Sequence, residues 1–106
     1  MQTFCPVEAL EQVRLAIGDA GAGKMGNYSH CSFVSSGFGH FLPLTGANPA
    51  IGEVGKPETV EEYKIEFVCE IEKVNDVMSA IKRVHPYEEV PIDIFQMLDL
   101  EDEVKV

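Results

Sequence analysis

The sequence predicts an α+β domain whose elements follow the order β-α-β-β-α-β. Two segments repeat apolar residues every three or four positions, as amphipathic helices do, and other segments alternate apolar and polar residues, as half-buried strands do. The chain has 106 residues, of which 45% are hydrophobic and 25% are charged. This length suits one hydrophobic core and is too short for two, so we expect a single domain over residues 1–106.

The chain begins with a short strand and a helix. Residues 3–5 are the expected strand, and residues 7–20 are the expected helix. Apolar side chains in the helix recur at helical spacing: Val7, Leu10, Val13, Ile17 and Ala20. Gly21 or Gly23 can supply the left-handed cap at its C-terminal end.

The glycine-rich segment that follows contains two β-like pieces. Residues 30–36 and 38–44 predict two strands that meet in a hairpin near Gly37. Residues 45–57 show no periodicity and form a long connection for a small domain. Long ordered loops tend to be functional or interfacial, so we expect one of these roles here.

The second half repeats the pattern of strand, helix and strand. Residues 61–71 alternate strictly, with one face formed by Tyr63, Ile65, Phe67, Cys69 and Ile71. Residues 71–84 have helical spacing, and His85 ends this helix because Pro86 disfavours the helical conformation of the residue before it. Apolar residues then alternate over 90–94, which predicts a last strand.

This order is the split β-α-β, or ferredoxin-like, arrangement, in which an antiparallel sheet carries both helices on one face. The opposite face would expose Phe33, Phe41 and Phe95. A monomer rarely leaves a patch of this kind in water, so we expect a homo-oligomer that covers the open face with other subunits.

The charge balance excludes two classes of partner. Eight basic against 18 acidic residues give a net charge of −10. Nucleic acids and anionic membrane surfaces both require basic patches, so neither is an expected partner. Part of this charge lies in residues 99–106, which we interpret as a solvated acidic tail.

The cellular compartment is also suggested by the sequence. The first residues lack the basic end and apolar stretch of a signal peptide, and no apolar run reaches the ~20 residues needed to span a bilayer. Cys5, Cys31 and Cys69 are odd in number and widely spaced, which favours reduced thiols, with Cys69 buried on a strand. We expect a cytoplasmic protein.

Two segments, residues 21–33 and 85–91, carry the candidate functional residues. Imidazole and carboxylate ligands suit zinc or copper, so His30, His85 and Glu88 form the candidate metal site. The alternative is that His85 is held by hydrogen bonds in a turn that contains proline. In that case Glu88 and its neighbour Glu89 pair across a subunit interface.

The same two segments supply candidate interface or ligand-binding residues. These are Asn27, Tyr28, Phe41, Tyr87 and Glu89. We expect the hydroxyl groups of Tyr28 and Tyr87 to be hydrogen-bonded at the edge of the core. Cys31 follows His30 directly, but adjacency is not the geometry of a thiol and its base, so no catalytic residue is assigned.

The two segments also resemble a known family. The sequence His85-Pro86-Tyr87-Glu88 resembles the signature of CutA-like proteins, which are trimeric relatives of the PII signalling proteins. The longer pattern Gly21-Ala22-Gly23-Lys24-Met25-Gly26-Asn27-Tyr28, followed by His30-Cys31-Ser32-Phe33 and Gly46-Ala47-Asn48-Pro49, resembles the CutA-like domain inserted in the Ngg-interacting factor three family. Members of that family are also described as type 2 homologues of GTP cyclohydrolase I.

The resemblance implies a CutA-like domain that assembles as a trimer. It also implies a free-standing domain, because the family carries its dinuclear metal site in a larger flanking domain for which 106 residues leave no room. We therefore expect a non-catalytic oligomeric module that binds a small ligand, a metal or another protein. The alternative is a metal-dependent hydrolase with its site in the cleft between subunits.

Overall fold

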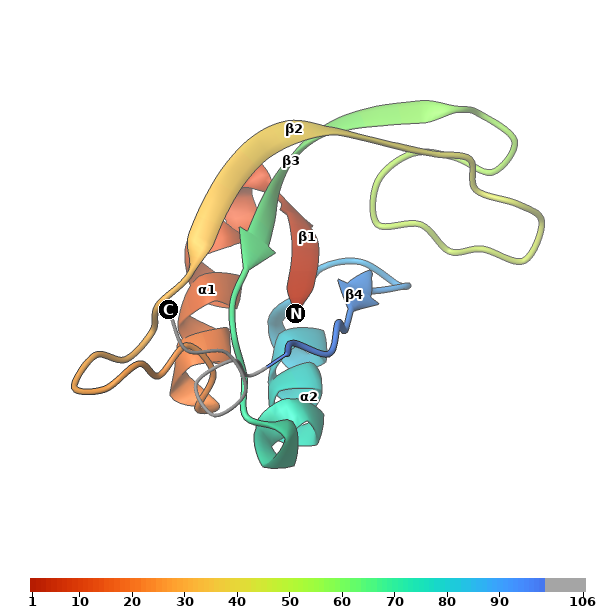
Figure 1. Ribbon diagram of the computed structural model, residues 1–106. Coiled ribbons are helices and arrows are strands. Elements are labelled where there is room, and N and C mark those ends of the chain that lie inside the picture. The colour runs from red at the N-terminus through yellow and green to blue at the C-terminus, as the bar shows by residue number, and fades with distance from the viewer. Residues whose placement is uncertain (99–106) are drawn as a thin grey trace.

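The computed structural model describes residues 1–98 and orders them as an α+β fold (Figure 1). The elements are β1 (Gln2–Pro6), a 3₁₀ turn (Val7–Ala9), α1 (Leu10–Asp19), β2 (Phe33–Phe41), β3 (Glu58–Glu66), a second 3₁₀ turn (Ile71–Lys73), α2 (Val74–Val84) and β4 (Ile92–Asp93). The acidic tail at 99–106 lies outside the described residues. Within residues 1–98, no helix is long and apolar enough to cross a membrane.

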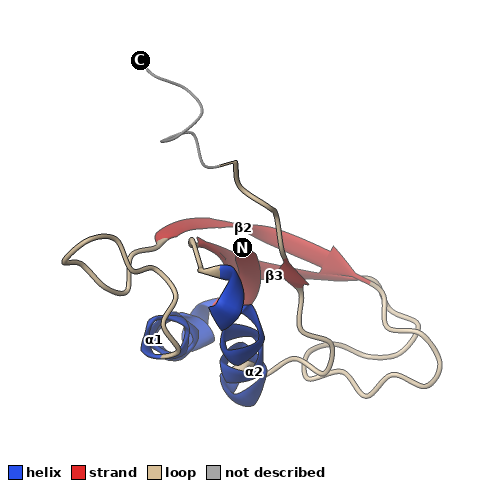
Figure 2. Cartoon of the chain, turned by 60° about the horizontal axis from the view of Figure 1, so that its bottom comes forward, coloured by secondary structure: helices blue, strands red, loops and turns tan. Residues whose placement is uncertain are grey.

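The four strands form one antiparallel sheet in the order β2-β3-β1-β4. Both helices lie on the same side of this sheet (Figure 2). The order β-α-β-β-α-β and the ferredoxin-like arrangement are therefore confirmed, although the two strands expected at 30–36 and 38–44 are the single strand β2.

The core lies between the sheet and the helices. The largest fully buried side chains come from β1, α1, β3 and α2: Thr3, Cys5, Val13, Ile65, Val77 and Ile81. The one polar member, Thr3, donates its hydroxyl hydrogen to the carbonyl oxygen of Pro91 at 2.8 Å. This bond satisfies a hydroxyl that would otherwise be costly to bury.

Helix α1 ends at a glycine, as the sequence predicts. Gly21 has a φ of 105° and donates its amide hydrogen to the carbonyl of Gly18, while Ala22 donates to Ile17. These two bonds form a Schellman cap, which satisfies carbonyl groups at the helix end.

The expected hairpin near Gly37 is wrong. Gly37 lies in the middle of β2, which pairs with β3 along its whole length, from Phe33 opposite Glu66 to Phe41 opposite Glu58. Two-residue hairpin turns need a positive φ, and Gly37 is not among the residues that adopt one. The true connection is the loop of residues 42–57.

The boundaries of two other strands also differ from expectation. β3 ends at Glu66, so Cys69 and Ile71 lie beyond the sheet; Cys69 is only partly buried and Ile71 is exposed. Beyond the strand, the carbonyl oxygen of Val68 accepts the amide hydrogen of Gly23, in the segment after α1, in place of a strand partner. β4 has only two residues, Ile92–Asp93.

The distal halves of β2 and β3, with their connecting loop, extend away from the helices (Figure 1). We call residues 37–61 the arm. No helix packs under the arm, and Pro43 is its one buried residue. Of the three aromatic residues expected on the open face, Phe33 and Phe95 are exposed, whereas Phe41 is partly buried in the arm.

Candidate functional site

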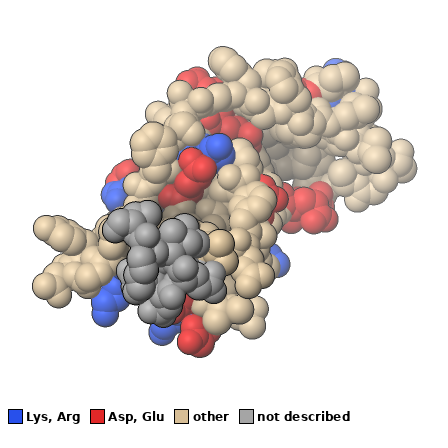
Figure 3. Space-filling view, in the orientation of Figure 1, with Lys and Arg blue, Asp and Glu red and all other residues tan. Residues whose placement is uncertain are grey.

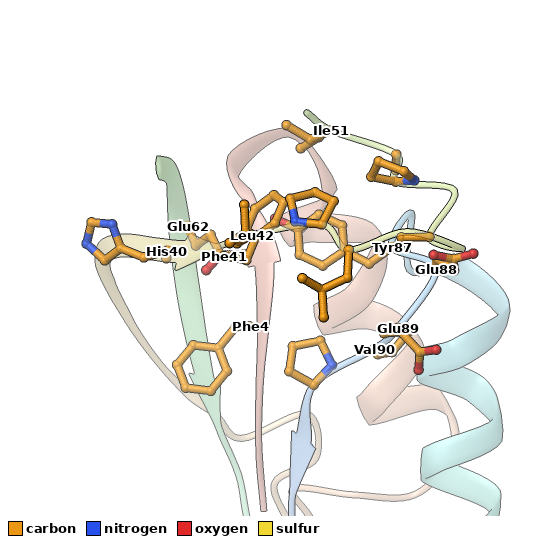
Figure 4. Close-up of a pocket in the computed structure, with 17 residues that line it drawn as sticks. Phe4, His40, Phe41, Leu42, Ile51, Glu62, Tyr87, Glu88, Glu89 and Val90 are labelled. Carbon is orange, nitrogen blue, oxygen red and sulfur yellow. The ribbon is translucent and has the colours of Figure 1, made fainter. Parts of the chain in front are cut away.

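A cavity in the described residues lies between the arm and the segment that links α2 to β4. We call it the arm cavity; it is partly open to solvent and has a volume of about 750 Å³. Figure 3 shows a hollow beneath the arm with carboxylate groups along its margin. Its walls are mostly apolar and include Phe4, Phe41, Pro43, Ile51, Val90 and Pro91 (Figure 4).

One wall of the cavity is the corner segment, residues 85–91, which His85 fixes. This side chain is buried, and its Nε2 lies 2.6 Å from the carbonyl oxygen of Phe4, while its Nδ1 accepts the amide hydrogen of Tyr87 at 3.1 Å. Because Nδ1 accepts, the proton is on Nε2, which donates to Phe4. Both ring nitrogens are therefore occupied, as the hydrogen-bonded interpretation of this histidine predicts.

Tyr87 extends from the corner segment to β3. Its hydroxyl donates to Oε2 of Glu62 at 2.6 Å, and burial together with the Glu62 carboxylate raises the pKa of Tyr87 well above its usual range. The hydroxyl therefore stays protonated and remains a donor. This bond confirms the expectation that Tyr87 is anchored at the edge of the core.

Gly39 makes room for this contact. A side-chain Cβ at Gly39 would collide with Oε1 of Glu62, so the glycine leaves space for the carboxylate in the position where it meets Tyr87. Gly39, Glu62 and Tyr87 therefore form one connected arrangement between the arm, β3 and the corner segment.

Two further carboxylates lie on the opposite side of the cavity from Glu62 (Figure 4). Glu88 accepts the amide hydrogen of Asn48 with both oxygens, at 3.0 and 3.2 Å, and so connects the corner segment to the arm loop. Glu89 is exposed. The ion pairs within residues 1–98 involve none of Glu62, Glu88 and Glu89.

The structure does not bring the three candidate metal ligands together. His30 contacts Asp19 and Ser29 through its two ring nitrogens, at 2.9 and 2.8 Å, and lies over Gly18; it shares none of these contacts with His85 or Glu88. Within residues 1–98, no group of three or more histidine, cysteine, aspartate and glutamate side chains is arranged to hold a metal ion. Zinc or copper binding thus stays a prediction.

Asn27 and Tyr28 lie on a tight turn at the end of the molecule opposite the arm. Both are exposed, so the expectation that the Tyr28 hydroxyl packs at the core edge is wrong.

His30 does not act as a base for the neighbouring thiol of Cys31 in this arrangement. Its two ring nitrogens contact Asp19 and Ser29 instead.

Gly39, Asn48 and Glu62 form or hold the cavity but were not assigned a role from the sequence, although Asn48 belongs to the motif that carries the family resemblance. Glu62 and Gly39 come from paired strands, and only the register of β2 on β3 places them together. Asn48 acts through its main chain, so its side chain carries no signal. The one usable signal was the unusual length of the loop, which did indicate a special role.

Comparison with known proteins gives the following matches. No protein-family model matches the chain. The chain is 50% identical over 95 residues to the GTP cyclohydrolase 1 type 2 homolog of Bacillus subtilis, covering 90% of this chain and 26% of the relative. It is 45% identical over 95 residues to the protein of the same name from Mycobacterium tuberculosis, covering 90% of this chain and 25% of the relative.

A solved structure supports the same correspondence. The crystal structure of a Bacillus cereus protein related to NIF3 matches 92% of this chain and 25% of its own length, with 43% identity and a TM-score of 0.81. The chain is similar to one segment of these proteins. It spans about a quarter of the length of the curated relatives that it matches.

Proposed function

We propose that this chain is a CutA-like, non-catalytic binding module of the NIF3 kind, which assembles as a homotrimer and uses the arm cavity for recognition. The relatives are named for a reaction, but the chain covers only about a quarter of their length. We therefore assign binding and assembly to this segment, and no reaction.

The observation that carries this proposal is the composition of the arm cavity. It has apolar walls, three carboxylates and a hydrogen-bonded tyrosine, and it is formed by segments far apart in the sequence. A concave apolar surface with a few fixed polar groups is typical of binding sites. The polar groups hold the walls in place: Glu62 and Tyr87 bind one another, and Glu88 binds the main chain of Asn48.

Assembly is supported by the exposed aromatic side chains of β2. Phe33 and Phe38 are both about two-thirds exposed, on an edge strand that has no neighbour beyond it within the described residues. The two side chains lie on opposite faces of the strand, five residues apart. An open strand edge that carries large exposed apolar side chains is usually covered in a soluble assembly.

A metal-dependent hydrolase is the alternative function. It needs His30, His85 and Glu88 at one metal, and the observed hydrogen bonds occupy both nitrogens of His85. Zinc chloride and copper sulfate titrations of tag-free protein, followed by thermal unfolding, test this alternative. The hydrolase predicts a saturable rise in the unfolding temperature that His85→Ala abolishes; no change in the unfolding temperature would contradict it.

Two measurements test the proposed module. Sedimentation equilibrium should give three times the chain mass, and a monomer at all concentrations would contradict the assembly. Nile red, an uncharged dye that fluoresces in apolar sites, should bind the dilute chain. Phe41→Ala should weaken dye binding because Phe41 lines the cavity, whereas Phe38→Ala on the same strand should not. Equal effects of the two variants would contradict recognition by the cavity.

A further inference from the structure

The turn that follows α1 forms a narrow projection, residues 24–28, which we call the finger. Met25 and Tyr28 exchange two main-chain hydrogen bonds, each of 2.9 Å, and Gly26 adopts a φ of 56° between them. Glycine at the first central position is typical of tight two-residue turns. The finger is therefore a well-defined local structure.

The side chains of the finger are poorly suited to water. Met25 is 66% exposed and Tyr28 is 75% exposed, side by side on paired residues. Tyrosine and methionine are enriched at the centres of protein interfaces, where a large side chain is buried in a partner's pocket. The finger thus has the composition of an interface anchor.

The arm cavity is complementary to the finger in polarity and in charge. Its walls are apolar, and its charged groups are the carboxylates of Glu62, Glu88 and Glu89. Lys24 lies beside Met25, is exposed, and takes part in none of the ion pairs within residues 1–98. A cation next to two apolar anchors matches a cavity that combines apolar walls with carboxylates that make none of the described ion pairs.

The finger cannot reach the cavity of its own chain. Figures 1 and 2 both place the turn after α1 and the arm loop at opposite ends of the molecule, whose longest dimension is 53 Å. The finger can therefore enter only the cavity of another copy. A contact of this kind joins two different surfaces, and copies linked in this way close into a ring when the rotation between them permits.

We propose that the finger of one copy inserts into the arm cavity of a neighbouring copy, with Met25 and Tyr28 against the apolar walls and Lys24 at the carboxylates. This inference rests on the proposed function, because it names the partner of the same cavity. It also makes each cavity a structure shared by two subunits.

A charge exchange tests the contact. Lys24→Glu and Glu89→Lys should each raise the dissociation constant of the assembly about tenfold, because each places like charges together. The double variant restores opposite charges, so its dissociation constant should return to within about twofold of the original. Glu89 is suitable because its side chain makes none of the described hydrogen bonds or ion pairs, so the variant should fold.

The control for net charge is Lys82→Glu, at an exposed position on α2 away from the finger and the cavity. It should leave the dissociation constant unchanged. The contact would be overturned if the losses of binding free energy in the two single variants simply added in the double variant.

Photo-crosslinking locates the contact directly. With Tyr28 replaced by p-benzoylphenylalanine, irradiation should give a covalent dimer whose crosslink maps to the arm cavity of the second copy, at Phe4, at Glu62 or within residues 39–51 or 87–91. A crosslink at any other surface, or no dimer from protein that sediments as an oligomer, would overturn the finger contact and leave the proposed assembly standing. A monomer at all concentrations would overturn both, while Nile red would still test the cavity as the site of another ligand.

Discussion

The arm and the rest of the described chain, which we call the body, share β2 and β3 but are stabilised in different ways. In the body, β3 places Ile65 against both helices, and the side chain is fully buried. In the arm, the same strand pairing continues with no helix beneath it, and Pro43 is the one buried residue of 37–61. Main-chain hydrogen bonds alone therefore do not explain why the arm has a defined position.

The difference shows what positions the arm. Two side-chain contacts connect it to the corner segment: the Tyr87 hydroxyl with Glu62, beside Gly39, and the Glu88 carboxylate with the amide of Asn48. Isolated two-stranded ribbons are marginally stable in water. These contacts, together with a partner subunit in the proposed assembly, supply the stability that a helix supplies in the body.

The largest expected effect on the free energy of unfolding comes from replacing isoleucine by alanine, once in the body and once in the arm. Ile65→Ala leaves a cavity in the core and should lower the free energy of unfolding by about 3 to 4 kcal/mol. Ile51→Ala removes a partly exposed side chain from the arm loop and should cost about 1 kcal/mol. Urea unfolding followed by circular dichroism measures both. Equal losses would mean that the arm is as tightly packed as the body.

A smaller effect concerns two glycines that lie two residues apart on β2. Gly39→Ala displaces the Glu62 carboxylate and breaks its bond to Tyr87, whereas a Cβ at Gly37 meets no atom within 4 Å. Gly37→Ala should be neutral or slightly stabilising, because alanine reduces the freedom of the unfolded chain. The two variants should therefore differ by about 2 kcal/mol in the free energy of unfolding.

The double variant Gly39→Ala/Tyr87→Phe shows whether the loss of stability comes from the broken hydrogen bond or from steric strain. If the loss comes from the broken hydrogen bond, Gly39→Ala should have little further effect once the Tyr87 hydroxyl is absent. A full additional loss in the Tyr87→Phe background would instead point to steric strain in β2 itself.

The same contrast explains which parts of the structure could be predicted. In the body, Val13 and Ile17 recur at helical spacing and Tyr63 and Ile65 alternate, so periodicity identifies the helices and the central strand. In the arm, Gly37 resembles a turn residue, and a glycine within an extended strand gives the same local signal as a glycine in a hairpin. The expected hairpin was wrong for this reason.

The candidate site was predictable only where one segment contains it. The motif beginning at His85 located the corner segment, and its proline fixed the end of α2. The partners of this segment, Glu62 and Asn48, come from the arm and β3. Their proximity depends on strand register and on the path of a long loop, which no local pattern encodes.

The smallest expected effect concerns the connection between the arm loop and the corner segment. Glu88 accepts the Asn48 amide with both oxygens on an exposed surface, so Glu88→Ala should raise the hydrogen-exchange rate of that amide about fivefold, which corresponds to about 1 kcal/mol. Glu88→Gln keeps one acceptor oxygen and should give a smaller increase. Glu89→Ala is the matched control, because it removes the neighbouring carboxylate and leaves the Asn48 bond intact. If all three variants exchange like the original chain, Glu88 does not hold the arm, and the defined position of the arm must come from Tyr87 and Glu62 alone.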